Sequence, residues 1–189
     1  ARKIALNSAY GAVGNQYFRY YDVRQASGIT TAGQFIIRFI ETKVNEYLNR
    51  ILQTHDKIDY IVASDTDSIY LTMDKLVEQV CKDKTKEQTL KFLNKVVESR
   101  IEPFLDKCFK QLAEYTNAFQ NKMVMKREVI ADKGIWTGKK HYMLSVLDSE
   151  GVRYDEPDIK MMGIEAVRSS TPNVLSLIHI SEPTRQAEI

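Results

Sequence analysis

The spacing of apolar residues divides the chain into helical stretches and a later group of strands. Over residues 26–53 apolar residues recur every three or four positions, which predicts one long amphipathic helix. Shorter helical patterns cover residues 2–10, 74–81 and 87–119. Asp74 is the expected N-cap of the second of these, and Pro103 should break the third or start a new helix at Glu102. The stripe expected to face the core of the long helix comprises Ile36, Ile40, Val44, Leu48 and Ile51.

A period of two begins after Lys122 and predicts strands. Residues 123–131 alternate as one strand, Lys133-Gly134 is expected to turn the chain, and residues 136–146 form the next strand. Residues 148–151 are a predicted hairpin turn into residues 152–154, which makes this segment a β-meander. An earlier hairpin is expected over residues 60–71, so the predicted fold class is α+β.

Composition adds few constraints. The chain has 189 residues, 43% of them hydrophobic and 28% charged, as is usual for a soluble globular protein. A net charge of +2 is too small to identify a nucleic-acid-binding protein. Cys81 and Cys108 are expected to be reduced thiols, and no apolar run reaches the length of a membrane span. Because Ala1 falls inside a helical pattern, we expect a fragment that begins within an element.

Two aspartates stand at the tip of the first predicted hairpin, in the sequence Ser64-Asp65-Thr66-Asp67. Residues two apart on a strand point to the same side, so Asp65 and Asp67 are expected to lie side by side. Their repulsion would be relieved by Mg²⁺, which prefers one or two carboxylates together with substrate phosphates. The alternative is an ordinary turn in which both aspartates bind backbone N–H groups.

Two other stretches have chemistry suited to nucleotides. Lys3, Asn7 and Tyr10 are spaced to share one helix face, which could meet a phosphate, a sugar or base edge, and a ring. A solvated face with a half-buried tyrosine would give the same pattern. Aromatic and basic residues are interleaved over residues 16–24, which fits either base stacking or a packed connector.

The meander carries a local positive charge that the net charge hides. A solubilising strand face explains Lys126 and Lys133. Adjacent Lys139-Lys140 are instead expected to point to opposite faces of a strand, so that one faces inward or a ligand. The basic residues of this patch are Lys126, Arg127, Lys133, Lys139 and Lys140.

Three of these stretches resemble, in order, successive motifs of the family B DNA polymerases: KIALNSAYG at 3–11, DTDSIY at 65–70 and WTGKKHY at 136–142. Within that family the sequence resembles the T-even-type bacteriophage replicative polymerases over about residues 1–174. The resemblance implies a polymerase palm, an antiparallel sheet with a metal-binding hairpin packed by helices, after the last fingers helix. The implied parts are residues 1–25, the end of the fingers and a connector; 26–168, the palm; and 169–174, the start of the thumb.

The resemblance also implies an activity: template-dependent transfer of a nucleotide from a dNTP to a primer 3′-hydroxyl, with two Mg²⁺ ions. The setting would be viral DNA replication in the cytoplasm of an infected bacterium. Asp65 and Asp67 would be the catalytic, metal-binding carboxylates, with Asp67 the firmer ligand. The incoming nucleotide would be bound by Lys3, Asn7 and Tyr10. Primer–template DNA would be contacted by Lys139, Lys140 and Tyr142.

Two residues depart from the family pattern, and parts of a polymerase are missing. Ser64 stands where the family usually has Gly, and His141 where it often has Arg. An upstream Asp that completes the metal site should lie outside this chain, as should the exonuclease domain and most of the thumb, so the isolated fragment should not polymerise. A sliding clamp and other replisome proteins would bind through those missing regions, and no membrane partner is expected. The tail, residues 175–189, resembles a translated sequencing adapter and is predicted not to be native.

Two other functions are open. A metal-dependent glycosyltransferase would use its DxD motif to bind a nucleotide-sugar diphosphate, but it leaves KIALNSAYG and Lys139-Lys140 unexplained. A non-catalytic nucleic-acid-binding module explains the basic meander, but it sets two carboxylates against a polyanion.

Overall fold

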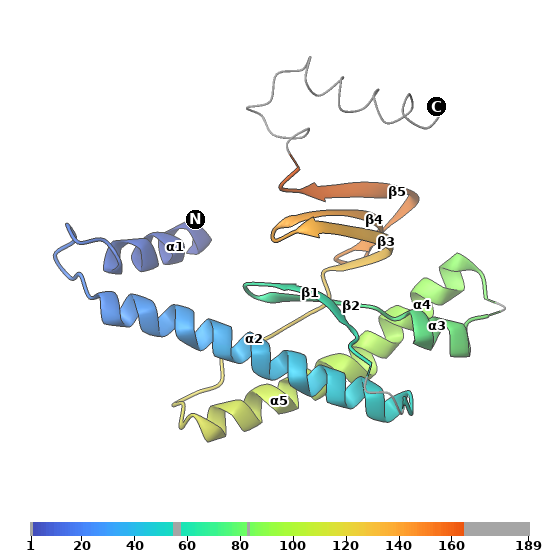
Figure 1. The fold of residues 1–189 in the computed structure, drawn as a ribbon, viewed down its shortest axis with the longest axis horizontal. Coiled ribbons are helices and arrows are strands. Elements are labelled where there is room, and N and C mark those ends of the chain that lie inside the picture. Colours follow the sequence, from blue (N-terminus) through green and yellow to red (C-terminus); the bar gives the residue numbers. More distant parts are fainter. Residues whose placement is uncertain (1, 55–57, 83, 165–189) are drawn as a thin grey trace, which may run out of the picture. The chain divides into compact units, whose positions relative to one another are not determined.

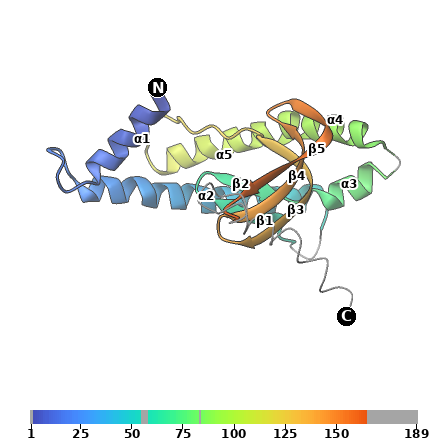
Figure 2. The same ribbon diagram turned by 90° about the horizontal axis from the view of Figure 1, so that it is seen from above.

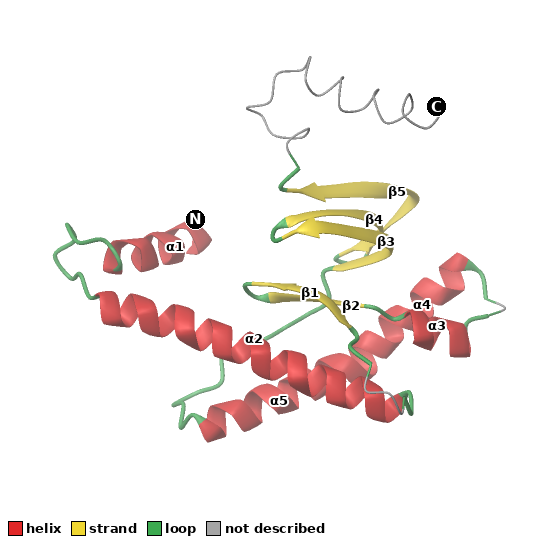
Figure 3. Cartoon of the chain, in the orientation of Figure 1, coloured by secondary structure: helices red, strands yellow, loops and turns green. Residues whose placement is uncertain are grey.

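The computed structural model describes residues 2–54, 58–82 and 84–164, and it confirms an α+β fold (Figures 1 and 3). The chain forms two compact units: unit 1 is Ala1–Asp83 with Lys107–Asn121, and unit 2 is Lys84–Asp106 with Lys122–Ile189. Among the described residues, no helix is both long enough and apolar enough to cross a membrane. The predicted thumb start and the tail from Leu175 lie outside the described residues.

In unit 1, a loop reverses the chain between helix α1 (Arg2–Val13) and helix α2 (Val23–Ile51) (Figure 1). The Asp22 side chain caps α2 by accepting a 2.9 Å hydrogen bond from the Arg24 N–H. The long helix therefore begins before the predicted start at Ala26. Asp22 is a residue type that favours the N-cap and lies four positions before the periodic stretch, so the sequence held a signal for the earlier start.

The core of unit 1 lies along the second half of α2. Ile40 and Val44 have no exposed surface, and Leu48 is buried one turn later, which confirms this part of the predicted stripe. Ile51 was wrongly placed in that stripe: it is 49% exposed, and Leu52 is buried instead. Helix α5 (Glu102–Tyr115) runs beside α2 in both Figure 1 and Figure 2. It buries Cys108, Phe109 and Leu112, and burial raises the pKa of the Cys108 thiol.

Two asparagines of α2 bind the backbone that leads into the first hairpin. The Asn49 carbonyl oxygen accepts a 2.9 Å bond from the Ile58 N–H, while its amide donates to the Ile58 carbonyl oxygen at 2.7 Å. One turn earlier, the Asn45 carbonyl oxygen accepts from the Tyr60 N–H at 2.8 Å, and its amide donates to Asp59 at 2.8 Å. Hydrogen bonds from the Ile61 N–H and the Asn45 amide lower the pKa of Asp59.

The hairpin predicted over residues 60–71 is confirmed, with longer strands than expected. Strand β1 (Ile61–Asp65) pairs antiparallel with strand β2 (Ser68–Leu71), and Asp65 stands opposite Ser68. Helix α3 (Asp74–Val80) follows. Asp74 is the first helical residue and not the predicted cap; Met73 holds the cap position and makes no side-chain bond there.

In unit 2, the predicted break at Pro103 takes the form of a widened turn. Helix α4 (Lys86–Val96) begins with a capping box between Thr85 and Gln88. A π-helical turn, η1 (Val97–Ile101), follows, and the Glu102 N–H reaches back to the Val97 carbonyl oxygen. Because proline lacks an N–H and its ring crowds the carbonyl four residues earlier, the wider turn accommodates Pro103 at the start of α5.

A meander of three antiparallel strands forms the rest of unit 2, in the order β3 (Val129–Gly138), β4 (His141–Ser149) and β5 (Val152–Met162) (Figure 1). The meander is confirmed, but its predicted boundaries were wrong. Residues 122–128 are not a strand, because β4 ends at Ser149, opposite Val129, and offers them no partner. The predicted turn at Lys133-Gly134 lies inside β3, and the chain reverses instead at Lys139-Lys140.

Gly134 is needed for packing and not for a turn. A Cβ on Gly134 would lie 2.6 Å from the Trp136 ring and 2.8 Å from a Leu144 methyl group, so only glycine fits beneath that ring. Strand β5 also runs past its predicted end at Tyr154. Its irregular stretch, residues 154–157, stands opposite Leu147 alone, and a proline there is tolerated because β5 is an edge strand.

A buried ion pair lies at the end of the sheet opposite the Lys139-Lys140 turn. Asp148 on β4 is 4% exposed and binds the Arg127 guanidinium. The same carboxylate accepts a 3.1 Å bond from the Gly151 N–H, within a Glu150-Gly151 turn in which both residues have positive φ, of 51° and 88°. The predicted basic patch is therefore corrected, because Arg127 neutralises an internal carboxylate and does not face solvent.

We predict that Asn49→Ala destabilises the chain by about 1–3 kcal/mol, because it leaves the Ile58 N–H and C=O without these partners. Urea unfolding followed by circular dichroism measures the change. Gln34→Ala, at an exposed position of the same helix, is the matched control and should shift stability by less than about 0.5 kcal/mol. Equal effects of the two substitutions would contradict a structural role for Asn49.

Candidate functional site

The tip of the β1–β2 hairpin is a tight turn built on one strained residue. Thr66 has φ of +54°, and the Asp67 N–H donates to the Asp65 carbonyl oxygen at 2.6 Å, as in a γ-turn. A β-branched residue rarely adopts positive φ, and such conformations persist at functional sites when the surroundings enforce them. The Ser68 hydroxyl also donates to the Asp65 carbonyl oxygen, at 3.1 Å. No pattern in the sequence indicated this strain.

Asp65 and Asp67 do not lie on the same strand, as the prediction of side-by-side carboxylates had assumed. Asp65 is the last residue of β1 and is half-buried, whereas Asp67 lies in the turn and is exposed. Strand alternation therefore does not apply to the pair, and their common direction stays a prediction. The Thr66 hydroxyl donates to an Asp65 carboxylate oxygen at 2.9 Å, which holds that side chain at the tip. Ser64 is exposed, so the side chain that replaces the family's Gly does not crowd the hairpin.

The donor set at the tip fits part of a Mg²⁺ site. Both groups are carboxylates, the hard oxygen ligands that Mg²⁺ prefers, and Asp67 is open to solvent. Within residues 2–54, 58–82 and 84–164, no group of three or more His, Cys, Asp or Glu residues could hold a metal. The two aspartates can thus supply a partial ligand set, which other residues would have to complete.

Helix α1 carries the second group of predicted site residues. The helix is confirmed, so positions 3, 7 and 10 fall on one face of its backbone. Asn7 is exposed, and Tyr10 is 42% exposed. The side chain of Lys3 lies outside the described part of the structure.

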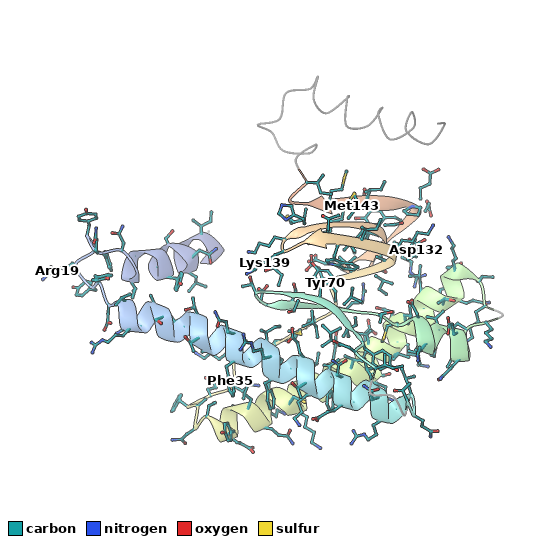
Figure 4. All side chains as sticks on the ribbon, viewed as in Figure 1. Arg19, Phe35, Tyr70, Asp132, Lys139 and Met143 are labelled. Carbon is teal, nitrogen blue, oxygen red and sulfur yellow. The ribbon has the colours of Figure 1, made fainter. Side chains whose placement is uncertain are left out.

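The aromatic and basic residues between α1 and α2 are open to solvent. Tyr17 and Tyr20 are 88% and 69% exposed, and the Arg19 guanidinium lies 5.6 Å from the centroid of the Tyr20 ring. Figure 4 labels Arg19 in this loop. Arg24 pairs with Asp22, so its charge is partly neutralised by the helix cap. The exposure of the rings is unlike that of a packed connector, and no ligand contact is assigned to them.

The Lys139-Lys140 pair forms the turn between β3 and β4, so the predicted strand geometry was wrong. Both lysines are exposed, and Lys140 has φ of +63°. Figure 4 labels Lys139 at this end of the sheet. Two adjacent exposed lysines at a turn are of the type that contacts nucleic-acid phosphates.

Tyr142 and one further cation of the meander, Lys160, have structural roles. Tyr142 is only 6% exposed, and its ring centroid lies 6.4 Å from that of Trp136, so it offers little surface to a ligand. Lys160 donates to Glu128 at 2.9 Å, and this hydrogen bond raises the pKa of Lys160. Of the three residues predicted to contact DNA, Lys139 and Lys140 are exposed and Tyr142 is buried.

Comparison with known proteins connects these features. The family model described as "Divergent Family B DNA polymerase" matches residues 23–178. The chain is 46% identical over 184 residues to a DNA-directed DNA polymerase of Escherichia phage RB69, an alignment that covers 92% of this chain and 20% of the relative. It is 44% identical over 184 residues to a DNA-directed DNA polymerase of Enterobacteria phage T4, with the same coverage of 92% and 20%.

The family match begins at the first residue of α2 and contains the β1–β2 hairpin and all three strands of the meander. It ends four positions after residue 174, where the resemblance in the sequence was expected to stop. The chain spans about a fifth (20%) of the length of these two relatives. With more than half of its residues inside the family match, this chain belongs to the divergent family B DNA polymerases.

Proposed function

We propose that the chain is part of a DNA-directed DNA polymerase that transfers nucleotides from dNTPs to a primer 3′-hydroxyl during viral DNA replication in an infected bacterial cell. The observation that carries this proposal is its identity of 46% and 44% to two phage enzymes with that name. Family membership favours this function over a glycosyltransferase or a non-catalytic binding module, because it accounts for the hairpin and the basic turn together.

We assign each segment of the chain to a polymerase subdomain from the motifs that it contains. Residues 26–168 would form the palm, whose first helix begins slightly earlier, at Val23. Residues 1–25 would end the fingers, residues 169–174 would begin the thumb, and residues 175–189 would be a non-native tail. The rest of the polymerase would supply the third carboxylate and any clamp contact.

Phosphoryl transfer depends mainly on positioning and on the neutralisation of negative charge. When bound, Mg²⁺ would neutralise charge on the triphosphate and on the transferring phosphoryl group. Asp67 would hold the metal directly, since it is exposed at the turn, and Asp65 would be oriented by the Thr66 hydroxyl. The face of α1 would bind the incoming nucleotide, with Lys3 on its phosphates.

We predict that Asp67→Ala, in a complete polymerase carrying this segment, lowers single-turnover extension by at least about a hundredfold while DNA binding survives. Asp65→Ala should retain measurable activity or be partly rescued by Mn²⁺. Asp106→Ala, an exposed carboxylate on α5, is the control and should extend normally. Full activity of folded Asp67→Ala protein would end the assignment, and loss of thermal stability alone would favour two turn-forming aspartates.

We also predict that Lys140→Ala weakens primer–template binding and lowers the slope of log affinity against log salt by about 0.9, the value of one phosphate contact. Lys126→Ala removes an exposed lysine from an irregular segment before the sheet and serves as the comparison. Fluorescence anisotropy over a series of salt concentrations gives both slopes. If the two variants had the same slope, the turn would not be the DNA contact.

A third prediction concerns Lys3. In the complete enzyme, Lys3→Ala should raise the Michaelis constant for dNTP or lower turnover, with primer–template affinity nearly intact, because a lysine on this helix face suits a phosphate. Lys110→Ala, an exposed lysine on α5, should change neither quantity. A loss of DNA affinity without a change in nucleotide kinetics would refute the role given to Lys3.

A further inference from the structure

The backbone of the Lys139-Lys140 turn is held by its own neighbour, His141. The ring nitrogen Nδ1 of His141 lies 2.7 Å from the Lys139 carbonyl oxygen. A carbonyl oxygen can only accept, so Nδ1 carries the hydrogen and donates it. The Thr137 hydroxyl donates to the His141 carbonyl oxygen at 3.4 Å, a longer bond across the same turn. The imidazole thus fixes one peptide group of the turn from within.

A residue from the far end of the meander lies against the other peptide group. Gly163, directly after β5, has φ of +71°. A Cβ there would lie 3.1 Å from the Lys140 carbonyl carbon and still closer to its oxygen, and 3.0 Å from Cδ2 of the His141 ring. The space beside the turn therefore accepts glycine and no other residue without movement of the backbone of Lys140.

These contacts surround a lysine in an unfavourable backbone conformation. Lys140 has positive φ, although neither turn residue is Gly, Asn or Asp, the types that usually accept it. The His141 ring bonds one peptide group of the turn and Gly163 packs against the other, so a change of this backbone conformation would disturb both contacts. A fixed backbone reduces the number of directions open to a long, flexible side chain, and so lowers the cost of ordering it on a ligand.

We propose that Gly163 and His141 are positioning residues that fix the Lys139-Lys140 turn and thereby direct its ammonium groups at the phosphates of primer–template DNA. This inference rests on the proposed function of the turn. It also gives His141 a role of its own: where the family often has an Arg, this chain has a side chain that binds the turn's own carbonyl group. The lysines make the contact with DNA, and the two positioning residues act through them.

The first test compares two glycines with positive φ in a full-length polymerase that carries this segment. Gly163→Ala adds a methyl group against Lys140, whereas Gly151→Ala adds one where nothing lies within 4 Å, so both carry the conformational penalty and only the first disturbs the turn. Gly163→Ala should lower the salt slope of primer–template binding by about 0.9, and Gly151→Ala should leave it unchanged. Equal slopes for the two variants would overturn the role of Gly163.

The second test uses His141 and does not depend on whether Gly163→Ala folds. His141→Ala should lower the same salt slope, while His141→Asn, whose side-chain amide can donate from nearly the position of Nδ1, should restore it. A merely structural ring would change the melting temperature without changing the slope. If His141→Ala has the wild-type slope, or if His141→Asn fails to rescue it, the proposal is wrong.

Lys140→Ala tests whether the turn contacts DNA at all, independently of whether Gly163 and His141 position it. Combined with Gly163→Ala, it should lower the slope no further than either change alone, because both remove the same contact. If Lys140→Ala lowers the slope and neither positioning variant does, the turn binds DNA without their help. If Lys140→Ala also has the wild-type slope, the proposed DNA contact itself fails.

Discussion

Two asparagine side chains on α2 determine how unit 1 is built. Asn45 and Asn49, one helical turn apart, each present a carbonyl oxygen to an N–H of the segment that leads into β1. Because a side-chain amide offers a donor and an acceptor together, the pair takes the place of a neighbouring strand. It sets the register in which Ala63 and Asp65 are half-buried and Val62 and Ser64 are exposed, and a slip by one residue would exchange these two faces of β1. The position of the hairpin tip, and of the carboxylates on it, follows from that register.

Most elements of the fold could be predicted from the sequence, whereas the turns of the meander could not. Helical periodicity located α2 because a single stripe of apolar residues is buried along its second half. Alternation identified the meander but placed its first turn at Lys133-Gly134, since glycine is a usual turn residue. Gly134 is required beneath Trp136, and the chain turns at two lysines that contact Gly163 and His141. The contact between Gly163 and Lys140 joins residues far apart in sequence and so leaves no local pattern.

In the candidate site, the residues could be predicted from the sequence but their placement could not. Asp65 and Asp67 could be chosen from their spacing and from the family resemblance, but their placement depends on the turn at Thr66, which strand alternation does not describe. Tyr142 belonged to a recognisable motif, yet it is buried beside Trp136, and burial is decided by packing and not by the motif. Further ligands of the proposed metal site would have to come from beyond the described residues, which hold no group of three or more metal-ligating side chains.

At Thr66, the stability of the fold and the placement of the Asp65 carboxylate favour different residues. Replacing a β-branched residue of positive φ by Gly or Asn relieves a conformational cost of about 1–3 kcal/mol. Selection for heat resistance alone would therefore favour losing this threonine. The same change removes the hydroxyl that holds the Asp65 carboxylate. Variants selected for thermal tolerance and variants selected for the proposed polymerase activity should consequently diverge first at this residue, while the strands on either side of it stay the same.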